Sequence, residues 1–184
     1  MEAVNEREKM LAGEPYDPLD PDLTADRVRA QAVVIAFSAE PDEDRRMAML
    51  GELLGEIGPE TVVVPPFFCD YGANIQFGTD CFVNTNAVFL DCAEITVGDR
   101  CQFGPGVQVL AADHPREPEL RLADVELARP VVIGTNVWIG GGAILCPGVT
   151  IGDHSVIGAG SVVTKDVPER VVAAGNPCRV IRQL

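Results

Sequence analysis

Residues 133–163 read IGTNVWIGGGAILCPGVTIGDHSVIGAGSVV. An aliphatic residue returns there at every sixth position, and a small or β-branched residue stands four positions after each of these anchors. A six-residue period fits neither a helix nor a flat strand, and it is typical of a parallel β-helix. Each side of a triangular coil would direct one anchor toward the axis, and we expect the glycines that follow four of the anchors to serve tight turns at the corners. The anchors are Ile133, Ile139, Leu145, Ile151, Ile157 and Val163.

The same period extends toward the N-terminus with an interruption. Anchors at positions 77, 83 and 89 are spaced by six, and a second run at 97, 103 and 109 starts eight residues later, as if two residues had been inserted. The pattern is then lost until position 133, and residues 111–120 are polar and contain two prolines. Loops that leave a regular scaffold often carry function, so we expect site residues in an excursion at 111–130.

Residues 1–60 lack the six-residue period and are predicted to be helical. Apolar stripes predict helices over 5–12, 23–38 and 42–56, with Pro21 in a first-turn position. The first coil of a β-helix would otherwise expose its core and strand edges, so we expect these helices to cover it. The predicted organisation is an N-terminal helical region (1–60) followed by a β-helix domain (61–184), which ends in a short, irregular cap or strand.

Composition and charge exclude several classes of function. The net charge of −14 argues against a nucleic-acid or anionic-membrane partner. No apolar run is long enough to cross a bilayer, and the charged N-terminus lacks a signal segment, so we expect a cytoplasmic protein without membrane contact. Residues 165–184 hold four basic and two acidic side chains. This local excess is either a solvated tail or a phosphate-binding patch.

The cysteines and histidines do not predict a metal site. The six cysteines form no CxxC pair and lie in or beside apolar repeat positions, so we interpret them as reduced packing residues. Zinc carbonic anhydrases built on hexapeptide repeats need a cluster of histidine ligands, whereas this chain has only His114 and His154. His154 lies in a repeat turn and is expected to face water. His114 lies in the excursion and is a candidate catalytic residue.

Several segments resemble the maltose and galactoside O-acetyltransferases, and the match covers nearly the whole chain. The resemblance implies a left-handed parallel β-helix that assembles as a homotrimer and transfers an acetyl group from acetyl-CoA to a sugar hydroxyl. The segments are GEPY (13–16), CDYGANI (69–75), NVWIGG (136–141), PGVTIGD (147–153) and VTKDVPERVVAAGNPCRVI (163–181).

The resemblance also implies roles for individual residues. His114 would deprotonate the acceptor hydroxyl directly, because no serine or cysteine nucleophile stands in a comparable motif. Asn84 aligns with an active-site asparagine, although an inert turn residue is the alternative, and Asp91 would orient His114 or bind the acceptor. Cys92 stands where galactoside acetyltransferase has a second acidic residue, which favours the maltose type. The acceptor pocket would contain Asp17, Asp20, Arg27, Asp70, Asn84 and Asp91.

For acetyl-CoA, the resemblance implies a groove between neighbouring coils and subunits. Backbone around Gly104, Gly141 and Ala159 would bind the pantetheine amides, and Trp138 would flank this arm unless it packs ordinarily at a coil side. The phosphates would be held by Thr164, Lys165, Arg179 and Arg182.

Two other functions remain open at this stage. Xenobiotic acetyltransferases that modify antibiotics share this fold and this base, so they are the nearest alternative. A non-catalytic structural β-helix is the alternative from another class, but it would not need a histidine-bearing loop or a basic C-terminal segment.

Overall fold

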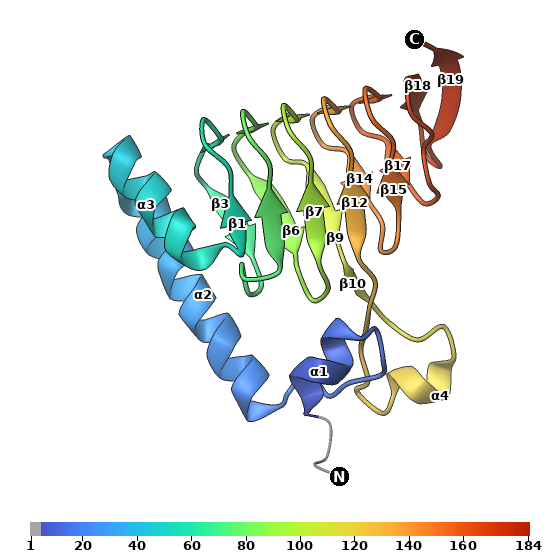
Figure 1. The fold of residues 1–184 in the computed structure, drawn as a ribbon. Coiled ribbons are helices and arrows are strands. Elements are labelled where there is room, and N and C mark those ends of the chain that lie inside the picture. Colours follow the sequence, from blue (N-terminus) through green and yellow to red (C-terminus); the bar gives the residue numbers. More distant parts are fainter. Residues whose placement is uncertain (1–4) are drawn as a thin grey trace.

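The computed structural model describes residues 5–184, which form a triangular prism of parallel β-coils with helices at one end (Figure 1). Residues 1–4, the start of the predicted helical region, lie outside the described residues. The first sheet contains β1 (Glu56–Ile57), β4 (Ile75–Phe77), β7 (Ile95–Val97), β12 (Val131–Ile133) and β15 (Thr150–Ile151). The second contains β2 (Val62–Val63), β5 (Phe82–Val83), β8 (Gln102–Phe103), β13 (Trp138–Ile139), β16 (Val156–Ile157), β18 (Val171–Ala174) and β19 (Arg179–Gln183). The third contains β3 (Phe67–Cys69), β6 (Ala87–Leu90), β9 (Gln108–Leu110), β14 (Ile144–Leu145) and β17 (Val162–Val163).

The predicted anchors fill the interior of the prism. All six anchors from Ile133 to Val163 are at most 1% exposed, and the residues four positions after them are also buried. In the earlier coils the interior is filled by aromatic rings, with centroids 5.5 Å apart for Phe77 and Phe89 and 5.8 Å apart for Phe89 and Phe103. The six-residue period therefore predicted the fold and its core correctly.

The expected reason for the glycines was wrong. Gly104 and Gly140 follow their anchors without a positive φ, so the turn itself does not require them. Glycine is required there by the next coil. A Cβ on Gly104 would lie 2.4 Å from the Gly141 nitrogen, and a Cβ on Gly140 would lie 2.4 Å from the Ala159 nitrogen. The positive φ angles occur two residues later, for example +69° at Gly106. Glycine follows the anchors because successive coils approach too closely for a side chain.

Three helices precede the prism: α1 (Glu6–Leu11), α2 (Pro21–Ala39) and α3 (Glu43–Leu53). The second packs on the third and on β3, and together they cover the first coil, at the end opposite β18 and β19 (Figure 1). The third helix ends before the predicted residue 56, because Gly55 donates its N–H to the Gly72 oxygen and the chain continues into β1. None of the helices in residues 5–184 is long and apolar enough to cross a membrane.

The excursion contains more regular structure than its sequence predicted. The short strands β10 (Ala112–Asp113) and β11 (Leu127–Ala128) pair antiparallel, and α4 (Pro118–Arg121) lies between them. Helix α1 contacts β11, so the N-terminal region and the excursion meet beside the prism (Figure 1). The C-terminus forms an antiparallel pair of β18 and β19.

Candidate active site

Two corners of the prism carry the predicted site residues. The corner between the third and the first sheet, which we call the long corner, consists of residues 70–74, 91–94 and 111–130 in successive coils. The corner between the second and the third sheet, the glycine corner, consists of residues 84–86, 104–107, 140–143 and 158–161. The two-residue insertion and the excursion noted in the sequence therefore stack at the same corner.

The long corner contains a hollow of about 350 Å³ beside His114. Coils, excursion and the N-terminal region all contribute to its wall, so the structure brings His114, Asp70 and Arg27 together. The hollow is lined by Pro18, Leu19, Arg27, Asp70, Leu90, Cys92, Ala112, His114 and Glu126.

Two carboxylates in this wall keep acceptor capacity for a ligand. Asp70 accepts a weak hydrogen bond from the Cys92 thiol, with Sγ 3.7 Å from Oδ2, and burial raises the pKa of this carboxyl above its usual range. Glu126 accepts a hydrogen bond of 2.8 Å from the Tyr16 hydroxyl, whose pKa is raised, chiefly by burial. Among residues 5–184 neither carboxylate forms an ion pair.

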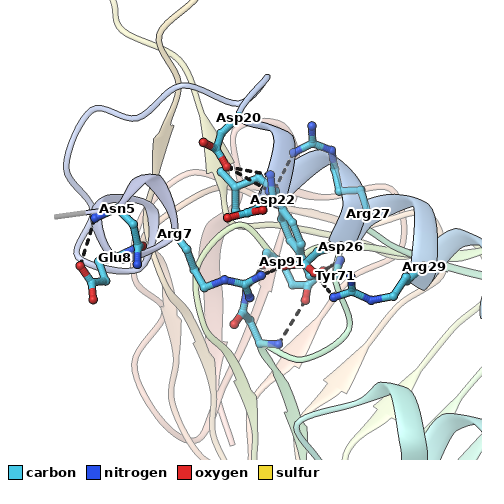
Figure 2. A network of polar contacts seen from close by, with 12 residues as sticks. Asn5, Arg7, Glu8, Asp20, Asp22, Asp26, Arg27, Arg29, Tyr71 and Asp91 are labelled. Carbon is cyan, nitrogen blue, oxygen red and sulfur yellow. Dashed lines mark hydrogen bonds and ion pairs between the residues drawn. The ribbon is translucent and has the colours of Figure 1, made fainter. Parts of the chain in front are cut away.

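Arg27 is held in place by the protein around it. Its Nη1 donates to the Tyr71 hydroxyl over 2.6 Å, its Nη2 donates to the Pro18 oxygen over 2.5 Å, and the guanidinium lies 5.7 Å from the centre of the Tyr71 ring. Figure 2 shows Arg27 on α2, close to the ion pairs that Asp26 forms with Arg7 and Arg29. Arg27 is therefore a rigid donor at the edge of the hollow.

The structure pairs the Asp91 carboxylate with main-chain groups and not with His114. Asp91 is fully buried, and its oxygens accept the main-chain N–H groups of Asp70, Tyr71 and Asn74 at 2.9 to 3.3 Å. Burial raises the pKa of this carboxyl to about 6 despite these hydrogen bonds. The predicted contact with His114 is absent from this arrangement, because the carboxylate instead holds the neighbouring turn of the long corner.

Asp17 and Asp20 lie near the hollow without lining it. Asp20 caps α2, with its Oδ1 accepting the N–H groups of Asp22 and Leu23 (Figure 2). Asp17 accepts the N–H of Leu19 and contributes to an adjacent hollow. The wall of the His114 hollow between α2 and the excursion is formed by Pro18 and Leu19, which lie between these two aspartates.

Asn84 lies at the other corner. It precedes β6, whereas His114 follows β9 and β10, and β6 and β9 run parallel in register. One chain therefore places the two side chains at opposite edges of the third sheet. The Asn84 Oδ1 accepts the N–H of Thr85 over 2.8 Å, which leaves the Nδ2 amino group to donate outward.

The predicted pantetheine residues gather at the glycine corner. Gly104, Gly141 and Ala159 occupy successive coils there, with the close approaches described above. Trp138 projects from the adjoining second sheet and is 56% exposed, so it does not pack in the core. Thr164, Lys165, Arg179 and Arg182 are all exposed at the C-terminal end of the prism, with both arginines on β19.

The hollow contains residues that were not singled out in the sequence, among them Leu90 and Glu126. Tyr16, from the GEPY segment, supports Glu126 through its hydroxyl. Glu126 stands where the chain returns from the excursion, and Leu90 ends the strand before the two-residue insertion. Stacking the inserted corners on each other would have identified both positions. Within residues 5–184, no cluster of three or more His, Cys, Asp or Glu side chains is placed to hold a metal ion.

Comparisons with known proteins match both the N-terminal region and the hexapeptide repeats. Residues 9–58 match the maltose acetyltransferase hexapeptide capping motif, and residues 130–165 match the bacterial transferase hexapeptide (six repeats). Nodulation protein L of Rhizobium meliloti (strain 1021) is 51% identical over 95% of this chain and 97% of its own length.

Two solved structures are similar over nearly their whole length. The maltose O-acetyltransferase from Clostridium difficile 630 superimposes with a TM-score of 0.97 at 44% identity, covering 99% of this chain and 98% of the other. A galactoside acetyltransferase in complex with coenzyme A superimposes with a TM-score of 0.94 at 39% identity, covering 98% and 92% of the two chains.

Proposed function

Because the chain belongs to the maltose and galactoside O-acetyltransferase family of hexapeptide-repeat acetyltransferases, we propose that it acetylates a sugar hydroxyl, with His114 as the general base. The acyltransferase activity follows from the family. The sugar acceptor and the base rest on one observation above all, which is the hollow that combines His114 with Asp70, Arg27 and Glu126. Carboxylates and a guanidinium supply the acceptors and donors that a polyhydroxylated ligand requires.

The proposed reaction is direct transfer without an acyl-enzyme. The His114 imidazole accepts the proton of the acceptor hydroxyl while the oxygen attacks the thioester carbonyl carbon of acetyl-CoA. The tetrahedral intermediate then collapses, the carbon–sulfur bond breaks, and the imidazolium returns the proton to the departing sulfur. The Nδ2 group of Asn84 would donate to the oxyanion, a contribution worth about 3 kcal/mol for a well-placed donor.

This mechanism requires a neighbouring subunit. His114 and Asn84 lie at opposite edges of the third sheet of one chain, so a single chain does not contain both groups in one site. In a homotrimer, the long corner of one subunit can face the glycine corner of the next. We therefore place each active site between two subunits.

Acetyl-CoA would lie along the glycine corner. Its glycines leave the backbone accessible to the pantetheine amides, and the exposed Trp138 offers an apolar surface beside them. Thr164, Lys165, Arg179 and Arg182 would then bind the phosphates through charge-assisted hydrogen bonds. The similar galactoside acetyltransferase that holds coenzyme A supports this ligand.

The proposal is tested by measuring release of free CoA thiol from acetyl-CoA with a panel of acceptors. Glucose, maltose, a thiogalactoside, an amino sugar and chloramphenicol separate sugar acetylation from xenobiotic acetylation. We expect turnover with glucose or maltose and none with chloramphenicol. Turnover restricted to chloramphenicol would instead assign the chain to the xenobiotic branch.

A further inference from the structure

The residue before His114 is the centre of a small polar network. The main-chain N–H of His114 donates to Asp113 Oδ1 over 2.9 Å. The Asp113 side chain is only 12% exposed, and it forms ion pairs with Arg129, whose Nη2 lies 2.6 Å from Oδ2, and with Arg116, whose Nη2 lies 3.2 Å from Oδ1. One carboxylate thus contacts the backbone of the proposed base and two guanidinium groups.

The two arginines attach Asp113 to different parts of the molecule. Arg116 belongs to the same loop, three residues along the chain, and its side chain is 78% exposed. Arg129 follows β11, where its main-chain N–H donates to the Ala111 oxygen over 2.8 Å and its side chain packs beside Gly148 of the next coil. Arg129 therefore connects the carboxylate to the prism, whereas Arg116 connects it only to another residue of the same loop.

We propose that Asp113 and Arg129 form a positioning pair for His114, a role that rests on the proposed function. The strands β10 and β11 have two residues each, so their ladder alone restrains the loop weakly. The ion pair adds a second connection between the two sides of the excursion, immediately before His114. Displacing a catalytic group by about 1 Å can cost up to 10²-fold in rate, so such a restraint affects turnover.

The pair also places two opposite charges next to the main chain of His114. Arg129 offsets the negative charge of Asp113, and without this offset the carboxylate would favour the imidazolium, which cannot accept a proton. Other charged or titratable groups share hollows with His114 or neighbour Asp113, and they stay unchanged in the variants described next. They are Arg27 of α2, Asp70 and Cys92 of the long corner, Arg121, Asp124 and Glu126 of the excursion, and Cys146, which neighbours Asp113.

The test compares kcat, KM and the pH–rate profile of substituted full-length proteins by CoA release. We expect Arg129→Ala to lower kcat roughly tenfold, to leave KM for acetyl-CoA within about twofold, and to move the acid limb of the profile to higher pH. Arg129→Lys keeps the charge, so its acid limb should stay at the wild-type pH and most of kcat should return. Arg116→Ala, the matched control on the same carboxylate, should stay within about twofold of wild type.

Asp113→Asn should shift the acid limb in the direction opposite to Arg129→Ala, and misfolding would not produce such opposite shifts. This variant retains an oxygen for the His114 N–H but removes the negative charge, so the acid limb should move to lower pH while kcat falls. The positioning role is overturned if Arg129→Ala keeps the wild-type kcat and pH–rate profile, or if Arg116→Ala lowers kcat as much as Arg129→Ala does. It is also overturned if Asp113→Asn and Arg129→Ala both shift the acid limb in the same direction. If His114→Ala retains activity, the proposed base itself fails, which is a separate result.

Discussion

The long corner and the glycine corner are built from the same repeat but differ in the length of their connections and in the side chains they carry. At the glycine corner, successive coils approach so closely that a Cβ would not fit at Gly104 or Gly140. At the long corner, inserted residues lengthen the connections between the strands and bring in polar side chains such as Asp70, Asp91 and His114. Regular spacing thus leaves closely packed backbone at one corner, whereas departures from it form a hollow lined by titratable side chains at the other.

Removing the proposed base should have the largest effect. General-base catalysis by a positioned imidazole is worth about 10² to 10⁴ in rate, so His114→Ala should lower kcat by that factor. The glycine corner is untouched, so binding of acetyl-CoA, measured by calorimetry, should stay within about twofold. A folded variant that keeps more than about a tenth of the wild-type turnover would contradict base catalysis by His114.

Weakening the phosphate contacts should affect acetyl-CoA binding and leave the acceptor hollow unchanged. A charge-assisted hydrogen bond contributes about 1.5 to 3 kcal/mol, so Arg179→Ala should raise KM for acetyl-CoA roughly tenfold or more, with the acceptor KM unchanged. Added salt should narrow the difference in KM for acetyl-CoA between the variant and the wild type. Arg45→Ala is the control, because this exposed arginine lies on α3 at the opposite end of the prism. Equal changes in both KM values would argue against a phosphate contact.

Asp91 should make the stability of the long corner depend on pH. Its pKa is raised to about 6 in the folded protein from an ordinary value of 3.8, so the folded state binds the proton more tightly. Its contribution to the free energy of unfolding is therefore greatest below about pH 4 and falls by about 3 kcal/mol as the pH rises past 6. The Asp91→Asn variant has no titrating carboxyl at this position, so its free energy of unfolding should lack this pH-dependent loss.

The comparison is made by urea unfolding of both proteins at acidic and neutral pH. The wild type should lose stability relative to Asp91→Asn on going from about pH 4 to pH 7. A difference that stays constant would mean that folding leaves the pKa of Asp91 unchanged, and a difference that grows in favour of the wild type would mean that the fold lowers this pKa.

The smallest effect is expected at the third corner, between the first and the second sheet. His154 is half-buried there with φ +61°, and its Nδ1 lies 3.1 Å from Asn136 Nδ2, so it contacts protein more than the sequence predicted. It lines no hollow shared with His114. We expect His154→Ala to keep kcat and both KM values within about twofold and to change the melting temperature by a few degrees at most. A large loss of activity would weaken the contrast between the two histidines.

The sequence predicted the regular part of the molecule and only part of the site. The anchors were identified because a six-residue period leaves one apolar residue per coil side, a signal contained in neighbouring residues. The hollow depends on which irregular corners stack, so Glu126, 12 positions beyond His114 (126 − 114), could be found only from the coil register. The direction of the Asp91 carboxylate was likewise inaccessible, because its partners are main-chain N–H groups that have no sequence signature.

The central claim is that the long corner of one subunit and the glycine corner of its neighbour form one active site. Mixed trimers test it most directly: His114→Ala and Asn84→Ala chains are unfolded together, refolded as a one-to-one mixture and assayed for CoA release. Each parent should be nearly inactive, but a mixed trimer can join an intact His114 from one chain to an intact Asn84 from the other. Random assembly should restore about a quarter of the wild-type activity. Mixed trimers as inactive as both parents would contradict the claim, because His114 and Asn84 would then have to act within one chain.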